Sequence, residues 1–173
     1  MVKRIVSKFK QFFYFGNRSF NDYRQFLKTA VDSGFLFLPL NEFRYKNNEK
    51  IICLRHDIDF SLNHSLKIAR IENQANISAT YFVLHTAKYF YRDISKHKIN
   101  KSLISKLKYL QNTLGHEIGL HLDLMTIEKA YILNPDEYLK SLLRLLRDEG
   151  ININGVAPHG SFLIRNYRKE LTP

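Results

Sequence analysis

Apolar and polar positions alternate along this chain in segments that favour strands and helices in turn. Apolar and β-branched runs that end in polar residues predict strands, and apolar residues at spacings of three and four predict helices. The predicted strands are Ile51–Asp59, Ser78–Leu84, His116–Asp123 and Asn154–Pro158. The predicted helices run from Ser19 or Asn21 to Ser33, from Ser61 to Ala75, from Lys101 to Leu114 and from Pro135 to Gly150, and residues 86–100 are expected to form an irregular loop.

Alternation of strands with helices is typical of an α/β fold with parallel strands. Right-handed crossovers bring the carboxyl ends of such strands to one rim, where α/β proteins place their sites. We find no internal repeat or linker, so residues 17–173 are expected to form one domain.

The composition and charge of the chain argue against several classes of function. The chain has 173 residues and a net charge of +11, but its Lys and Arg residues are dispersed and form no recognisable nucleic-acid motif. We therefore expect no specific nucleic-acid partner. A single cysteine, Cys53, excludes an internal disulfide, and no apolar run approaches the ~20 residues of a membrane-spanning helix. The expected location is the cytoplasm.

Residues 1–16 form a separate N-terminal segment with a basic amphipathic pattern. Apolar residues at helical spacing alternate with lysine and arginine over residues 1–15. Such a helix can lie in a membrane interface, which predicts peripheral contact with the inner face of the membrane. A helix packed against its own domain explains the pattern equally well.

The first predicted strand carries the first candidate chemistry. Arg55, Asp57 and Asp59 alternate along it and share one face, with the two carboxylates about 6.5–7 Å apart at Cα. That spacing suits one carboxylate bound to a metal ion and another acting on water. The alternative is structural: Asp57 pairs with Arg55 and Asp59 caps the next helix.

Other strand ends add residues of the same chemical kind. The rim collects His85, His121, Asp123 and His159. His116 lies five residues before His121 and faces the opposite side of the strand. Ligand-type side chains at each strand end predict a metal or catalytic site.

Four segments together resemble successive motifs of the polysaccharide deacetylase family, carbohydrate esterase family four. They are Arg55-His-Asp-Ile-Asp59, Ser78-Ala-Thr-Tyr-Phe-Val83, His116-Glu-Ile-Gly-Leu-His121 and Ala157-Pro-His-Gly160. The first motif is similar to the His-Asp-x-Asp branch, which is associated with bacterial surface-polysaccharide gene clusters. The resemblance implies a deformed (β/α) barrel of the glycoside hydrolase/deacetylase type and metal-dependent removal of acetyl groups from a carbohydrate.

The resemblance also implies residue roles. Asp57 would be the general base, with Asp59 and His121 as ligands of zinc or another first-row divalent ion. Arg55, Pro158 and Gly160 would contact the acetylated carbohydrate.

The chain departs from the family pattern at three places. Met125 stands where the family has a second histidine ligand, so His159, Asp123 or His85 must complete the coordination, and we favour His159. Val156 and Ala157 replace the arginine of the third motif. A barrel of about 250 residues exceeds this chain, so we expect a barrel truncated after its fourth or fifth strand, without the family's general acid.

An open barrel exposes a strand edge, which predicts self-association. The alternative function is therefore a truncated, catalytically inactive domain with a binding or membrane-associated role.

Overall fold

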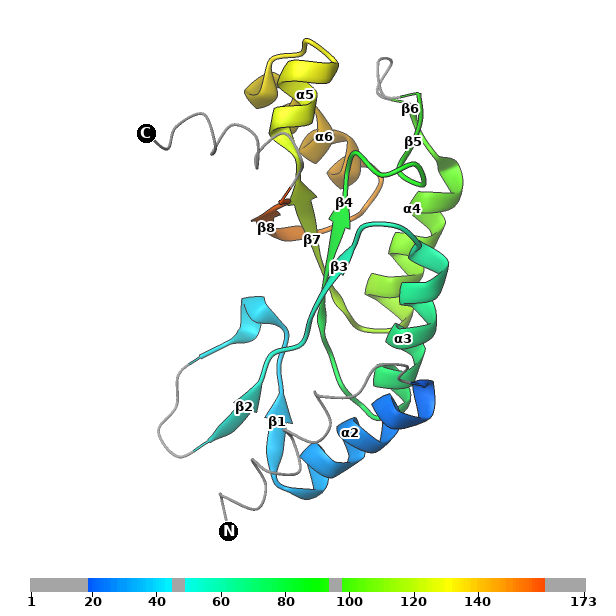
Figure 1. The fold of residues 1–173 in the computed structure, drawn as a ribbon, viewed down its shortest axis with the longest axis vertical. Helices are drawn as coiled ribbons and strands as arrows, with labels where there is room; N and C mark the ends of the chain where they lie inside the picture. The colour runs from blue at the N-terminus through cyan, green and yellow to red at the C-terminus, as the bar shows by residue number, and fades with distance from the viewer. Residues whose placement is uncertain (1–18, 45–48, 94–97, 161–173) are drawn as a thin grey trace, which may run out of the picture.

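The computed structural model describes residues 19–44, 49–93 and 98–160. At its centre is a parallel four-stranded sheet in the order β3-β4-β7-β8 (Figure 1). Its strands are β3 (Arg55–Ile58), β4 (Thr80–Leu84), β7 (Glu117–Leu122) and β8 (Ile153–Pro158). Three of the four predicted strands and the parallel α/β class are thus confirmed, whereas the first predicted strand is divided.

One face of the sheet is covered by helices. The helices that contribute buried side chains to this core are α3 (Leu62–Gln74), α4 (Lys101–Lys108), α5 (Leu124–Ala130) and α6 (Pro135–Asp148). Ile58, Val83 and Leu120 of the central strands belong to the same core. They lie in register across β3, β4 and β7. Side chains of the next residues point the other way, so the opposite face carries Asp57, Phe82 and Gly119.

A smaller layer lies at the amino-terminal side of the sheet. Helix α2 (Phe20–Asp32) begins at a capping box between Ser19 and Asp22 and packs near the parallel pair β1 (Phe35–Phe37) and β2 (Lys50–Ile52). The 3-10 turn η1 (Leu40–Glu42) follows β1.

Glycines end the predicted helices as expected. Gly34, Gly115 and Gly150 follow helical segments and have φ values of 77°, 71° and 76°. That left-handed region carries a steric cost for residues with a Cβ, so glycine is the natural helix stop there.

The structure corrects two local predictions and adds detail to two other segments. The expected strand 51–59 is two strands, because β2 pairs with β1 while β3 pairs with β4, and Cys53 and Leu54 separate them. The expected loop 86–100 contains an antiparallel pair, β5 (Tyr91–Asp93) and β6 (Lys98–Ile99). Helix α4 continues as a π-helical turn η2 (Tyr109–Thr113), and an unpredicted helix α5 (Leu124–Ala130) follows β7.

Other predictions concern the N-terminal segment, the closure of the barrel and membrane-spanning helices. The amphipathic segment 1–15 and the boundary after residue 16 lie outside the described residues. Within the described ranges the central sheet is open, with β3 and β8 at its edges. None of the helices described is long and apolar enough to cross a membrane.

Candidate metal centre

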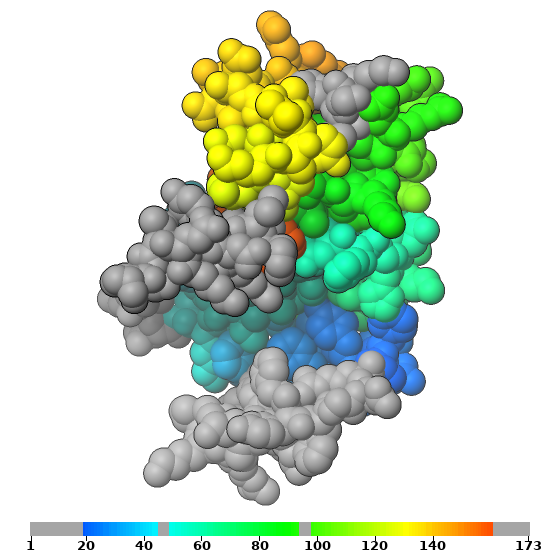
Figure 2. All heavy atoms as spheres, turned by 45° about the horizontal axis from the view of Figure 1, so that its top comes forward, coloured from blue at the N-terminus to red at the C-terminus, as the bar shows by residue number. Residues whose placement is uncertain are grey.

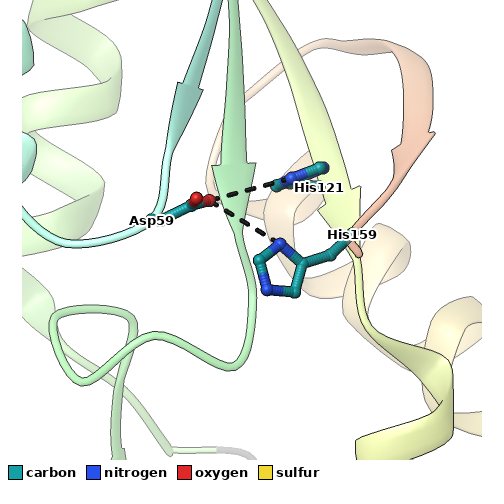
Figure 3. A group of neighbouring side chains, drawn as sticks. All are labelled: Asp59, His121 and His159. Carbon is teal, nitrogen blue, oxygen red and sulfur yellow. Dashed lines mark ion pairs between the residues drawn. The ribbon is translucent and has the colours of Figure 1, made fainter. Parts of the chain in front are cut away.

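Three strand ends converge at the carboxyl rim of the sheet (Figure 3). Asp59 follows β3, His121 lies near the end of β7, and His159 follows β8. The Asp59 Oδ1 atom is 3.7 Å from His121 Nε2 and 3.8 Å from His159 Nδ1. The three ligand-type atoms all lie within 4.8 Å of one another. Figure 2 shows this rim, with the red end of β8 visible between the yellow α5 segment and the turquoise start of α3.

The hydrogen bonding of His121 leaves one ring nitrogen for a ligand. A backbone carbonyl can only accept, so the 3.1 Å contact with Ala157 means that Nδ1–H donates to that oxygen. In the neutral ring, Nε2 then carries the lone pair and faces Asp59. A second hydrogen bond of this kind typically orients a metal-binding histidine.

The Asp59 carboxylate is the unusual group of the rim. Its Oδ1 atom is buried and accepts no hydrogen bond from the described part of the chain. Leaving a buried acceptor unsatisfied costs about 1–3 kcal/mol, and more if it is charged. A cation at this position would satisfy it.

The donor set fits a divalent cation such as zinc. Two imidazoles and a carboxylate are common zinc ligands, and ligands 2.0–2.2 Å from tetrahedral zinc lie roughly 3.3–3.5 Å apart. The separations of 3.7 and 3.8 Å in the triad are close to that range. All three atoms lie within 4.8 Å of one another, so the side chains would have to rotate toward a common point to hold the ion.

Asp57 stands beside the triad and is held by Arg55. Arg55 donates to both carboxylate oxygens of Asp57, at 2.8 and 2.9 Å, and this hydrogen bonding raises the pKa of the guanidinium. Asp57 Oδ2 is also 3.7 Å from His121 Nε2. The Arg55–Asp57 pair predicted as a structural alternative therefore exists, whereas Ser61, and not Asp59, caps helix α3.

Phe82 and Gly119 support this pair from the sheet. The Arg55 guanidinium lies over the Phe82 ring, 4.8 Å from its centroid. A Cβ on Gly119 would come within 2.4 Å of Phe82 Cε1, so only glycine leaves room for the ring there. Sequence analysis missed both residues, although their places beside Asp57 follow from the strand register.

His85 is one of three options for the third ligand, but both of its ring nitrogens make hydrogen bonds within the protein. Its Nε2 accepts from the Asp123 N–H at 2.8 Å, so Nδ1–H donates to the Tyr138 hydroxyl, also at 2.8 Å. Burial lowers its pKa to about 4, because it outweighs the opposing effect of the Asp123 charge, and the nearby His121 and His159 also lower it. Because the His85 ring is neutral and both of its nitrogens are hydrogen-bonded, we assign it a structural role and not that of a metal ligand.

Asp123, another option, caps the helix that follows β7. Its carboxylate accepts from the Thr126 N–H at 3.2 Å and from the Thr126 hydroxyl at 2.8 Å. This leaves His159 as the option whose ligand atom joins Asp59 and His121 in the triad.

Three of the remaining residues named from the sequence lie on or near the rim. Pro158 ends β8 and is exposed, as is Gly160 just after His159. Met125 lies in the first turn of α5. His116 is buried on the helix-covered side, as its spacing from His121 predicted, and its ring bonds the backbone of Ala69 and Ala79.

Comparison with protein-family models, curated proteins and solved structures gives no match. The chemistry of the rim therefore rests on its own geometry. Two imidazole nitrogens and a carboxylate can hold one divalent cation, and a second, solvent-accessible carboxylate beside them can exchange a proton with water.

Proposed function

We propose that this protein is a metal-dependent hydrolase that removes acetyl groups from a carbohydrate, in the metabolism of cell-surface polysaccharides. The observation that carries the proposal is the unsatisfied Asp59 carboxylate oxygen facing His121 and His159, with Asp57 alongside. The motif resemblance to polysaccharide deacetylases, with their deformed (β/α) barrel, supports the same reaction class.

Asp59, His121 and His159 would hold the cation. A bound zinc ion polarises an acetyl carbonyl and makes water a better nucleophile near neutral pH. Two imidazole ligands and one carboxylate leave a net positive site, which suits the oxyanion that develops during acyl transfer.

Asp57 is assigned the role of general base. Its side chain is partly exposed, so water can reach it, and the two hydrogen bonds from Arg55 fix the carboxylate plane. Asp57 would take the proton of the water that attacks the acetyl carbon. As the bond from that carbon to the sugar nitrogen or oxygen breaks, Asp57 would return the proton to the leaving atom, so that acetate and the free amine or hydroxyl are released.

Arg55 has a positioning role in this scheme, instead of the substrate contact that the motif resemblance implies. Arg55 would also take the place of the arginine that the third motif lacks before Pro158. The positioning role of Arg55 is supported by the local geometry. Arg55 and Asp57 are two residues apart on one strand, and Phe82 lies beneath the guanidinium.

Metal content tests the ligand assignment directly. Purified protein should bind about one zinc per chain, and Asp59→Asn, His121→Asn and His159→Asn should each lose most of it. Asp148→Asn and His64→Asn remove exposed residues of the same types and should keep the metal. A folded wild type that binds no zinc, cobalt or manganese would instead favour the catalytically inactive binding domain.

Activity tests the role of Asp57. Acetate release from N- and O-acetylated saccharides should fall about 10²–10⁴-fold in Asp57→Asn, the usual contribution of general base catalysis. The metal content of this variant should stay near that of the wild type. Undiminished acetate release would remove Asp57 from the mechanism.

A further inference from the structure

Helices α3 and α4 lie side by side on the outside of the molecule (Figure 1). Arg70 of α3 donates from Nε to the hydroxyl of Tyr109, the residue that follows α4, at 3.2 Å, and its guanidinium is 5.3 Å from the centroid of that ring. Nearer the starts of the two helices, Asn63 of α3 and Ser102 and Lys106 of α4 line one cavity. The outer sides of α3 and α4 therefore form one continuous surface, the α3–α4 surface.

The charged side chains of this surface are cations. They are Lys67, Arg70, Lys101, Lys106 and Lys108. The single carboxylate of the two helices, Glu72, is fully buried and accepts hydrogen bonds inside the protein. Helix α6 is different, because it carries three Lys or Arg residues and three Asp or Glu residues. The excess of positive charge is therefore a property of α3 and α4 and not of every surface helix.

Four of the five cations have no carboxylate partner among the described residues. Only Lys108 is near one, with its Nζ atom 3.9 Å from Glu149 Oε2. The other four side chains are exposed or half-buried. Like charges that face water on neighbouring helices repel one another, so an anionic partner would lower the free energy of this surface.

An exposed phenylalanine borders the α3–α4 surface. Phe60 lies between β3 and α3 and lines the same cavity as Lys106. Its relative exposure is 93%, the largest value among the exposed large apolar side chains in the described ranges. Removing such a ring from water is favourable. The surface therefore combines cations with an apolar group that a partner can cover.

An anionic lipid bilayer offers both kinds of contact. Its headgroups attract clusters of Lys and Arg, and the boundary of its hydrocarbon region accepts apolar side chains that stand beside them. Nucleic acid fits less well, because its binding surfaces combine cations with aromatic rings that stack on bases. Between Leu62 and Thr113, the described part of these helices has Tyr109 as its one Phe or Tyr ring, and Arg70 already contacts it.

We propose that the α3–α4 surface docks on an anionic membrane, with Phe60 inserted at the bilayer interface and the four cations that lack a carboxylate partner against the headgroups. This contact is separate from the one predicted for residues 1–15, and it does not depend on the proposed enzymatic activity. Asp59 and Phe60 are consecutive, with Cα atoms about 3.8 Å apart, so docking would place Asp59 near the membrane surface.

Vesicle flotation of the full chain tests the electrostatic contact. The protein should bind vesicles that contain phosphatidylglycerol, bind them less as the NaCl concentration rises, and not bind pure phosphatidylcholine. Lys67→Glu combined with Lys106→Glu should weaken binding at least about tenfold. Lys140→Glu combined with Arg144→Glu makes the same change in net charge on exposed residues of α6 and should have a much smaller effect. Equal losses in the two double variants, or no binding of the wild type, would overturn the proposal.

Fluorescence tests the insertion of Phe60. The sequence contains no tryptophan, so Phe60→Trp introduces a single reporter. Its emission should shift to shorter wavelength on phosphatidylglycerol vesicles and be quenched by brominated lipids. Phe43→Trp makes the same substitution at another exposed phenylalanine, just after η1, and should show neither change.

Two further measurements complete the test. Phe60→Ala should weaken vesicle binding about tenfold. An unchanged emission of Phe60→Trp in vesicle-bound protein would overturn the insertion. If Lys67→Glu combined with Lys106→Glu abolished binding to duplex DNA and left vesicle binding intact, the partner would be a nucleic acid and the membrane proposal would fail.

Discussion

Two carboxylates on opposite faces of the sheet have opposite surroundings. Glu72, in α3, is fully buried and accepts hydrogen bonds from Tyr23, from His56 at 2.6 Å and from Tyr81 at 2.5 Å. The buried Oδ1 atom of Asp59 at the rim has two histidine nitrogens nearby and no hydrogen bond within the described residues. The described residues satisfy the first group, whereas they give the second no hydrogen-bond donor, as the proposed metal site requires.

The histidines of the two regions repeat this contrast. His116 donates from Nε2 to the Ala69 carbonyl and accepts the Ala79 N–H at Nδ1, so both nitrogens serve the fold. His121, five residues later, uses only Nδ1 in this way. A structural histidine can therefore be distinguished from a candidate ligand by whether its second ring nitrogen makes a hydrogen bond within the protein.

The largest expected effect is loss of the Glu72 carboxylate. Glu72→Ala leaves one buried and two half-buried donors without their acceptor and should lower the free energy of unfolding by about 3 kcal/mol. Glu72→Gln keeps one accepting oxygen and should cost less. Urea denaturation measures both, with Glu128→Ala on the surface as the control, expected within ~0.5 kcal/mol. A loss in Glu72→Ala no larger than in the control would mean that this cluster is not stabilising.

The sheet face that carries Asp57 should tolerate no added side-chain volume at Gly119, which is buried against Phe82. Gly119→Ala places a Cβ 2.4 Å from Phe82 Cε1, and such overpacking should cost about 2 kcal/mol and disturb Arg55 and Asp57 above the ring. Gly155→Ala is the matched control, because its Cβ would lie 4.0 Å from the same atom.

Thermal unfolding of both variants measures the difference. Phe82→Leu combined with Gly119→Ala should recover part of the loss, because the smaller side chain leaves room for the new methyl group. Equal melting temperatures for the two alanine variants would show that the ring moves aside at no cost.

Most of the central sheet could be predicted from sequence, because its signals are local. Buried strands such as Thr80–Leu84 are continuous runs of apolar and β-branched residues, and the left-handed glycines Gly34, Gly115 and Gly150 ended helices where expected. The rim position of Asp57, Asp59 and His121 followed from strand direction alone.

The features that local patterns leave open depend on register between distant strands. A shift in the β7–β8 pairing between Ile118 and Gly119 sets Leu122 opposite Pro158, and this register brings His159 to Asp59. The break at Cys53 likewise arises because β2 and β3 have different partners. Local sequence patterns do not encode such pairings. The sequence alone therefore favours His159 as the third ligand but leaves Asp123 and His85 open.

The buried cluster should also make stability depend on pH. Burial lowers the pKa of His116 below its ordinary 6.5, and it outweighs the opposing effects of the bond to the Ala69 carbonyl and of the Glu72 charge, while His56 lowers it further. The unfolded chain then binds the proton more readily, so the free energy of unfolding should decrease as the pH falls below about 6.5. The effect should be smaller than that of Glu72→Ala.

Urea denaturation at pH 7 and pH 5 isolates this contribution. His116→Gln can still donate to Ala69 and accept from Ala79, but it cannot titrate. The variant should lose less stability than the wild type between the two pH values. The same loss in both proteins would assign the pH dependence to other groups.

The smallest expected effect is the sharpest test of the contrast between the two carboxylates. In metal-free protein, Asp59→Asn removes an oxygen that accepts no hydrogen bond in the described structure, so the free energy of unfolding should change by less than about 1 kcal/mol. With zinc at 100 times its Kd, the wild type should gain about 2.7 kcal/mol and the variant should gain little. Thermal unfolding of both proteins, in chelator and in zinc, measures the two differences in one experiment. A large loss in chelator would mean that Asp59 serves the fold as Glu72 does, while an equal zinc response in both proteins would place the metal elsewhere.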